Sequence, residues 1–546
     1  MSGQFASPPP LSMAVRQTLD RARGLSQAGR LAEADAAYRS VLAQEPTAVQ
    51  AAVGLARLMT RMGQAQAAES LLDGFLTGPA PWPDALSARA AARKAQGRKA
   101  AALADYALAA RLNPTSGVAA HNVASGLGDA GRDREAVAEC ERAFALGLDA
   151  PETWLVYGRA LQGLSQFEAS EQAFRKAIER RPAYAEAVRD LCQLLWMRSG
   201  DADHALAPIA TALAAAPAEA RAALAGVKIR LLNHIRGEAA ALAFAETALP
   251  QAPDDPRLAL ETAALLLAQD PGRSRSLCAA VLARRPGEAA ARRALAHACL
   301  ALGESREAAE IAETLLAERP FDQEAAAALA TAWRLAGDAR YRQLWDYEAL
   351  VGVYSLDTPR GWTTLGAYLD ELRGALGALH RLCAHPIEQS LRGGAQTPQN
   401  LRASEDPVIA AFFQAIEGPL AAYRLAVGQG SDLFRARNQG DCHVVGAWSV
   451  RLAPGGFHVD HIHPQGWISS ACYIEVPTAV GDGQDRAGWL RFGAPPIPTR
   501  PRLEAEYYVR PEPGRLALFP SYMWHGTVPF GGDQPRMTIA FDVAPD

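Results

Sequence analysis

The chain has 546 residues, of which 49% are apolar and 21% charged, and its formal net charge is −4. A chain of this length is too long to fold around one hydrophobic core, so two or more domains are predicted. The small net charge excludes a strong electrostatic attraction to nucleic acid or to an anionic membrane. The seven cysteines form no CxxC pair, so a disulfide or zinc-ribbon framework is disfavoured and a reducing, cytoplasmic setting is expected.

The N-terminal residues 1–13 are expected to be a flexible lead-in. They hold no basic segment followed by an apolar run, the pattern that predicts a signal peptide. No uninterrupted apolar stretch is long enough to predict a membrane span. Abundant Ala and Arg with very little Lys are typical of a GC-rich bacterial genome.

A repeat with a period near 34 residues follows. Its turn positions, each 34 after the previous one, are Gly29, Gly63, Gly97, Gly131 and Ser165. The series continues at looser spacing at Gly200, Gly237, Gly272, Gly303 and Gly337. Ala-rich segments with helical periodicity lie between these turns, and prolines such as Pro182 close the units. Gly permits a tight turn and Pro cannot continue a helix, so the pattern predicts stacked helix pairs.

The unit resembles the tetratricopeptide repeat. In its best copy, Trp154, Gly158, Phe174, Ala177 and Pro182 stand at that family's signature spacings. The resemblance implies an all-α solenoid of about ten helix pairs over residues 14–345. It also implies a concave surface that binds a protein or peptide, although a simple spacer would show the same repeat.

The composition changes after residue 345. A helix is predicted near 362–382, a loop at 391–402 and another helix at 406–427. Beyond residue 440 the hydrophobic period becomes two, in short segments bounded by Gly and Pro, which predicts a β-sandwich or barrel. We therefore expect a second domain at 346–546 with a β-core at about 440–546.

Histidines gather in this C-terminal part. His458, His461 and His463 fall within six positions together with Asp460, and a further histidine, His525, follows a predicted strand. An arginine, Arg536, opens the last predicted strand eleven residues later. Imidazoles suit iron with open coordination positions, and Arg pairs with a carboxylate through two hydrogen bonds.

A short ligand cluster, a distant His and then an Arg resemble the double-stranded β-helix iron(II)/2-oxoglutarate oxygenases. More narrowly, HIHPQGWISSACYIEVP, GWLRFGAPP and LALFPSYMWHGTVP, with HPIEQSLRGGAQT before them, are similar to a bacterial oxygenase group that is often fused to tetratricopeptide repeats. The resemblance implies a jelly-roll domain with flanking helices, Fe(II), 2-oxoglutarate and O2, with ascorbate as an optional addition.

Two ligand sets compete. The narrower group carries HxHP at this place, which favours His461 and His463 with His525; the alternative is the literal HxD pair, His458 and Asp460, again with His525. Alternate residues of a strand share a face, so either pair is sound, but both pairs cannot face one way on one regular strand. A mixture such as Asp460 with His461 is a third option.

The same resemblance implies that Arg536 holds the far carboxylate of 2-oxoglutarate. Ser470 and Tyr473 are further candidates for contact with the co-substrate, and loop residues Gln389 and Arg392 for contact with the substrate. The expected activity is hydroxylation of a protein or peptide recruited by the repeats. The alternatives are a binding scaffold with an inert barrel, and a cupin-like metalloprotein that does not use 2-oxoglutarate.

Overall fold

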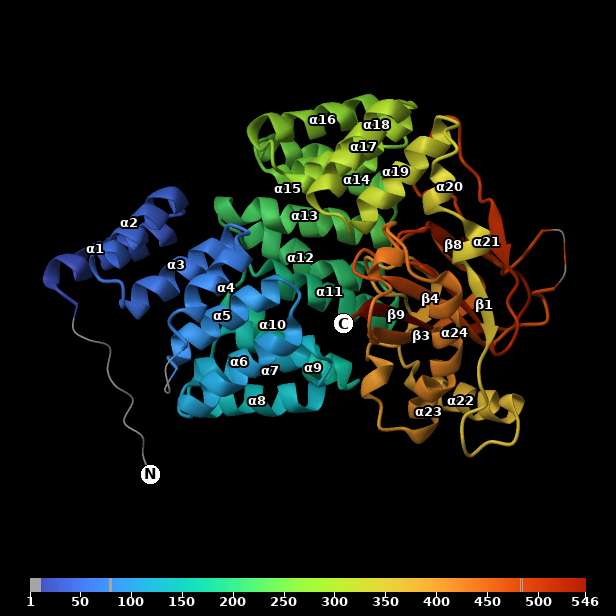
Figure 1. The fold of residues 1–546 in the computed structure, drawn as a ribbon, viewed down its shortest axis with the longest axis horizontal. Coiled ribbons are helices and arrows are strands. Elements are labelled where there is room, and N and C mark those ends of the chain that lie inside the picture. The colour runs from blue at the N-terminus through green and yellow to red at the C-terminus, as the bar shows by residue number, and fades with distance from the viewer. Residues whose placement is uncertain (1–10, 78–80, 482, 484) are drawn as a thin grey trace. The chain divides into compact units, whose positions relative to one another are not determined.

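The computed structural model describes residues 11–77, 81–481, 483 and 485–546 (Figure 1). Contacts divide the chain into two compact units, Met1–Arg181 and Pro182–Asp546. Most of the expected flexible N-terminus, residues 1–13, lies outside the described residues, and the first helix begins at Met13.

The first unit consists of helix pairs. Its helices are α1 (Met13–Gln27), α2 (Leu31–Gln44), α3 (Val49–Arg61), α4 (Ala65–Asp73), α5 (Pro83–Ala95), α6 (Lys99–Leu112), α7 (Gly117–Asp129), α8 (Asp133–Ala145), α9 (Pro151–Gly163) and α10 (Phe167–Arg180). The α9–α10 pair shows why the repeat needs small residues: a Cβ on Gly158 would lie 2.6 Å from the ring of Phe174. The ring of Trp154 stacks on Phe144 of the preceding pair at 4.2 Å, so aromatic side chains fill the space between these two repeats.

The second unit begins with more repeat helices. These are α11 (Ala185–Ser199), α12 (Ala202–Ala215), α13 (Ala218–Ile235), α14 (Glu238–Ala248), α15 (Pro256–Leu266), α16 (Pro271–Arg284), α17 (Ala289–Leu302), α18 (Ser305–Glu318) and α19 (Gln323–Leu335). They belong to the same compact unit as the C-terminal domain.

The predicted turns hold with one exception. Nine of the ten turn residues have positive φ, and at Ser165, where φ is 58°, a non-glycine residue takes the same conformation. Gly272 is the exception, because it lies in the first turn of α16. There Asp270 caps the helix by accepting a hydrogen bond from the Arg273 amide, and Pro271 occupies the first helical position, so the turn precedes the glycine.

Two antiparallel sheets form the C-terminal domain (Figure 1). Its strands are β1 (Gly352–Ser355), β2 (Leu391–Gln396), β3 (Cys442–His458), β4 (Ile468–Glu475), β5 (Leu490–Phe492), β6 (Tyr507–Val509), β7 (Arg515–Pro520), β8 (His525–Thr527) and β9 (Arg536–Pro545). The larger sheet has the order β1-β7-β4-β9-β3-β2, and the smaller one β6-β5-β8. The flanking helices are α20 (Tyr341–Leu344), α21 (Tyr347–Leu350), α22 (Leu365–Leu379), α23 (Pro407–Ala415) and α24 (Glu417–Val427).

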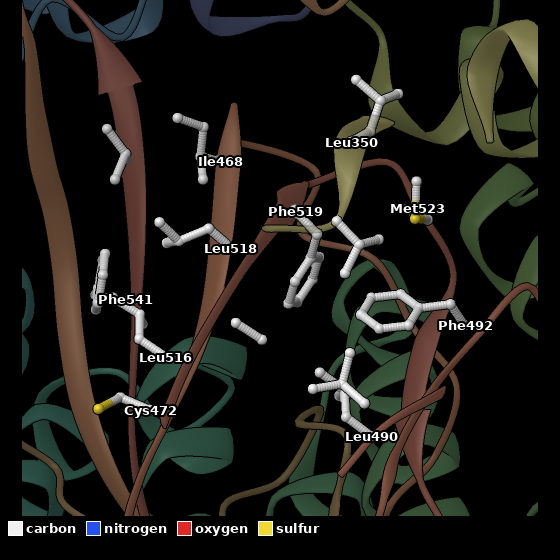
Figure 2. Close-up of a cluster of buried hydrophobic side chains, with 14 of the residues drawn as sticks. Leu350, Ile468, Cys472, Leu490, Phe492, Leu516, Leu518, Phe519, Met523 and Phe541 are labelled. Atoms are coloured by element: carbon white, nitrogen blue, oxygen red, sulfur yellow. The ribbon is translucent and has the colours of Figure 1, made fainter. Parts of the chain in front are cut away.

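The core lies between these two sheets and against the helices. Figure 2 shows Leu516, Leu518 and Phe519 of β7 among side chains from other elements, with Phe519 near Phe492 of β5. The rings of Phe519 and Phe492 meet edge to face at 4.9 Å. This apolar packing fixes the strands that carry the polar side chains described below.

Two predicted elements of the C-terminal domain are wrong. The loop expected at 391–402 contains strand β2, in which the pairing shifts register between Arg392 and Gly394. The single helix expected at 406–427 is two helices that meet at Ile416. Among the described residues, no helix is both long and apolar enough to cross a membrane.

Candidate metal and co-substrate site

Three histidines come together at the mouth of the barrel. His461 and His463 follow β3, and His525 opens β8. The backbones of His461 and His525 exchange hydrogen bonds of 2.9 and 3.0 Å, which join segments more than sixty residues apart. One ring nitrogen from each of the three histidines lies within 4.8 Å of the others.

The outer nitrogen of each ring fixes its orientation. Nδ1 of His461 donates to the carbonyl of Val459 and Nδ1 of His525 to that of Met523, both at 2.9 Å. Nδ1 of His463 donates to a carboxylate oxygen of Asp542 at 2.6 Å. Because these partners accept only, each Nε2 is left with a lone pair that can bind a metal.

Two of these lone pairs face each other. Nε2 of His461 and Nε2 of His463 are 3.2 Å apart. Two acceptors at this distance repel unless a cation lies between them. Ring nitrogens that each lie about 2.1 Å from one ion at a right angle are separated by about 3 Å, so the spacing fits one metal ion.

Burial keeps the imidazoles of His461 and His525 neutral. Burial, together with the neighbouring His463, lowers the pKa of His461 to about 3. The pKa of His525 is well below its ordinary value for the same reasons. Neutral rings are the form that binds a metal, so this environment favours coordination over protonation.

The alternative ligands have other partners. The carboxylate of Asp460 forms a two-pronged ion pair with Arg491, with distances of 2.9 and 2.6 Å. His458 pairs through Nδ1 with the hydroxyl of Ser390 at 2.8 Å. Neither His458 nor Asp460 belongs to the group of converging ligand atoms, which consists of His461, His463 and His525. His458 nevertheless lines the cavity that contains these three histidines.

Arg536 is a buried cation without a counterion. It is 2% exposed, and one Nη donates to the carbonyl of Gly488 at 2.5 Å. Its buried Nε has no hydrogen-bond partner in the part of the chain that the structure describes. Burial lowers the pKa of this guanidinium. Among the described residues no carboxylate pairs with Arg536. Since an uncompensated buried charge is costly, the arrangement fits a ligand that brings a carboxylate.

Tyr473 lies beside Arg536, and Ser470 lies on strand β4 together with Tyr473. The ring of Tyr473 is 5.8 Å from the guanidinium, and its buried hydroxyl has no hydrogen-bond partner within the described ranges. Burial raises the pKa of Tyr473 to about 12, so the hydroxyl stays protonated and can donate. The Ser470 hydroxyl already bonds the backbone of Phe541 in β9, which ties it to the sheet.

These groups line one cavity of about 760 Å³. The three histidines, Arg536, Tyr473 and Ser470 all contribute to its wall. The repeat helices contribute as well, through Arg230, Asn233 and His234 near the end of α13 and Glu261 of α15. All of these residues belong to the second compact unit.

Some residues that shape the site were not predicted. Asp542, which orients His463, also accepts a hydrogen bond from Ser469 at 2.8 Å, and Ser469 is its register partner across β4 and β9. Asp542 lies 79 positions from His463, so no local pattern identifies it. The residues of α13 and α15 that line the cavity occupy polar positions of amphipathic helices, and the sequence does not distinguish them from other surface positions of the repeats.

Comparison with known families agrees with this architecture. The model described as "Putative 2OG-Fe(II) oxygenase" matches residues 446–542. Tetratricopeptide repeat models match residues 25–92, 151–184 and 265–332. The search of curated proteins gives no match.

Solved structures similar to this chain are repeat proteins. A repeat protein of Thermus thermophilus is 18% identical, with a TM-score of 0.30, over 33% of this chain and 98% of its own. One from Parabacteroides merdae is 15% identical, with a TM-score of 0.32, over 52% and 98%. Yeast Tom70 is 12% identical, with a TM-score of 0.38, over 61% and 84%. The chain thus combines tetratricopeptide repeats with a C-terminal domain of the family described as putative 2OG-Fe(II) oxygenase.

Proposed function

We propose that the protein is an Fe(II)- and 2-oxoglutarate-dependent dioxygenase that hydroxylates a protein or peptide. In this proposal His461, His463 and His525 hold the iron. The observation that carries it is the convergence of three Nε2 atoms whose rings are fixed from behind. The family match over residues 446–542 supports the same chemistry.

Arg536 is proposed to hold the 5-carboxylate of 2-oxoglutarate, and Tyr473 to donate a hydrogen bond to the same group. Both have buried polar atoms without partners in the cavity wall, which a carboxylate would satisfy. When bound, iron(II) with 2-oxoglutarate and O2 supplies the conversion of a C–H bond to C–OH, with release of succinate and CO2.

The chain's own contribution is orientation and exclusion of water. Phe519 packs 4.6 Å from the ring of His525, and Phe492 lies behind it at 6.4 Å. The rings of Tyr473 and Phe530 lie 5.8 and 5.6 Å from the guanidinium of Arg536. These rings lower the local dielectric and so strengthen the attraction between Arg536 and a bound carboxylate. The repeat helices are proposed to recruit the substrate, since they line the same cavity.

Succinate formation tests this function. Purified protein is supplied with iron(II), 2-oxoglutarate and ascorbate in air, and succinate is measured with and without each component. We expect iron-dependent turnover that His463→Ala abolishes. Arg536→Ala should raise the 2-oxoglutarate concentration needed for half-maximal turnover by about a hundredfold, since a charge-assisted pair is lost.

The outcomes separate the competing functions. Binding of iron without binding of 2-oxoglutarate would instead favour a cupin-like metalloprotein, which three neutral imidazoles also suit. Absence of both would leave a binding scaffold. Substrates are sought as products 16 Da heavier in a lysate treated with the wild-type protein, with the Arg536→Ala variant as the control.

A further inference from the structure

The segment before β2 is fastened to the repeat helices of its own unit. The amides of Cys383 and Ala384 both donate to the carbonyl of Met197 in α11, at 2.9 and 3.1 Å. The indole of Trp196 donates to the carbonyl of His385 at 3.0 Å. Residues 383–385 are therefore attached to α11 at the point where the chain approaches the wall of the cavity.

The next contact is an ion-pair network with α13. Arg230 pairs with Glu388 at 2.5 Å and with Glu261 of α15 at 2.6 Å. Glu388 has a φ of 63°, one of three described non-glycine residues with positive φ. Such a conformation persists when its surroundings hold it, and here the bond to Arg230 is one such restraint. Both carboxylates of this network therefore already have an ion-pair partner, because they share the guanidinium of Arg230.

Arg392, four residues further along, has no such compensation. Its Nη1 donates to the backbone carbonyls of Gln389 and Leu391, at 2.7 and 2.8 Å. Within the described part of the chain, no carboxylate forms an ion pair with it. The side chain is half-buried in the wall of the cavity, and burial lowers its pKa.

The backbone around Arg392 is fixed by close packing. Gly393 has a φ of +66°, and a Cβ on Gly394 would lie 2.4 Å from the carbonyl oxygen of Arg451. A Cβ on Gly456 would lie 2.2 Å from the carbonyl oxygen of Gly393. The irregular pairing that these glycines permit sets the direction of the Arg392 side chain.

We propose that Arg392 determines substrate specificity by pairing with a carboxylate of a peptide substrate. This inference rests on the proposed function and specifies the substrate class for it. The cavity of about 760 Å³ exceeds what 2-oxoglutarate requires, so it has room for a substrate group. An arginine with free donors and no counterion matches a carboxylate in charge and geometry.

Arg392 and Arg536 serve different ligands in this proposal. Arg536 is almost fully buried and lies against Tyr473, whereas Arg392 is half-buried and stands on the segment attached to the repeats. Burial lowers the pKa of His458, whose ring bonds Ser390, and the charges of both guanidinium groups act in the same direction. Arg392, Arg536 and His458 line the same cavity, but the two arginines stand on different elements, β2 and β9.

A peptide library tests the proposal. The full-length protein with iron(II) and 2-oxoglutarate is incubated without oxygen with N-acetylated random peptides, and retained peptides are identified by mass spectrometry. One library is C-terminally amidated, so that only side chains carry carboxylates. The other has free C-termini and reports on the terminal carboxylate.

If a side-chain carboxylate is the ligand, we expect the wild type to enrich Asp and Glu in the amidated library by about tenfold. If the terminal carboxylate is the ligand, peptides with free C-termini should be retained about tenfold more than amidated ones. Arg392→Ala should abolish this enrichment, Arg392→Glu should replace it with enrichment of Lys and Arg, and Arg392→Lys should retain part of it. Arg306→Glu is the matched control, because Arg306 is 94% exposed on α18, where it pairs with Glu310. Circular dichroism establishes that each variant is folded.

Several outcomes would overturn the assignment. These are retention of no peptide, retention without preference for either acidic side chains or a free C-terminus, and a carboxylate preference that Arg392→Glu leaves unchanged. A tenfold loss of 2-oxoglutarate affinity in Arg392→Ala would assign the arginine to the co-substrate instead. Admitting air to the same samples tests the proposed function separately: succinate without carboxylate preference contradicts only the role of Arg392, and carboxylate preference without succinate contradicts only the oxygenase.

Discussion

At the scale of single residues, the site depends on groups that never touch the proposed metal. The ring of His463 is directed by Asp542, and Asp542 is itself held by Ser469. A carboxylate behind an imidazole fixes the tautomer and increases the basicity of the opposite nitrogen. The remaining two rings are fixed by backbone carbonyls, which substitutions of side chains cannot remove.

Asp542→Asn is predicted to weaken iron(II) binding by about tenfold or more, because the charge behind His463 is lost while the shape is kept. Affinity is measured by anaerobic titration against a competing chelator. Asp546→Asn is the control, since Asp546 forms a similar contact with His443 at an exposed position. Equal affinity in wild type and Asp542→Asn would contradict a role for His463 as a ligand.

Asp460 offers the opposite prediction. Its carboxylate is largely buried against Arg491, and removing one member of a buried pair leaves the other uncompensated. We expect Asp460→Asn to lower the free energy of unfolding by about 2 kcal/mol, as measured by urea denaturation, with iron affinity unchanged. A loss of iron binding with unchanged stability would favour the HxD ligand set.

At the scale of elements, the sequence predicts those that have a clear period or composition. The repeat helices follow from their helical periodicity, and strands β3, β4, β7 and β9 follow from short runs of β-branched and aromatic residues. Strands β4 and β7 are buried at nearly every position, so their sequences show apolar runs and no regular alternation. Strand β8 has three residues, too few to show a period. Strand β2 is not predicted from the sequence because the pair Gly393-Gly394 normally indicates a turn. Here the glycines lie within a strand, because a neighbouring backbone approaches too closely for a side chain.

The candidate site was predictable to the same extent. His461, His463 and His525 stand in recognisable segments, so their convergence could be expected. The partners that orient these side chains, or that keep other side chains from the metal, could not be predicted. Arg491 pairs with Asp460 across 31 positions of the sequence, and Arg230 pairs with Glu388 across a much longer interval. Such contacts depend on the tertiary fold and leave no local signal.

The link between α13 and the segment before β2 can be tested by hydrogen exchange. Arg230→Met keeps much of the side-chain volume but removes both ion pairs, so the left-handed backbone at Glu388 loses one of its restraints. We expect amides of residues 383–390 to exchange about tenfold faster, equivalent to about 1.4 kcal/mol, while those of β4 and β9 are unaffected. Lys228→Met on the same helix is the control, and equal exchange in all three proteins would contradict the restraint.

At the scale of the whole molecule, the composition change near residue 345 does not coincide with a gap in packing. The main hydrophobic cluster of the second unit contains Ala326 and Ala330 of α19 together with Leu350 and Phe519. Trp345, at the expected boundary itself, is fully buried in this cluster. The last repeat helices therefore form part of the support for the barrel.

Polar contacts cross the same position. The indole of Trp524, next to His525, donates to the hydroxyl of Thr331 in α19 at 2.9 Å. Arg334 of the same helix donates to the carbonyls of Gly493 and Glu504, both at 2.8 Å. A helix that bonds the residue beside a proposed ligand helps to define where that ligand stands.

Two fragments test this dependence. Residues 182–546 keep the cluster and these hydrogen bonds intact, so we expect cooperative unfolding and iron affinity close to that of the full chain. Residues 346–546 lack α19 and Trp345, expose the apolar side chains beneath them, and should bind a hydrophobic dye and precipitate. Chemical denaturation, dye fluorescence and metal titration are compared for both. A fragment 346–546 that unfolds cooperatively and binds iron as tightly as the longer one would show that the barrel is stable without the repeats, and would place the functional boundary where the composition changes.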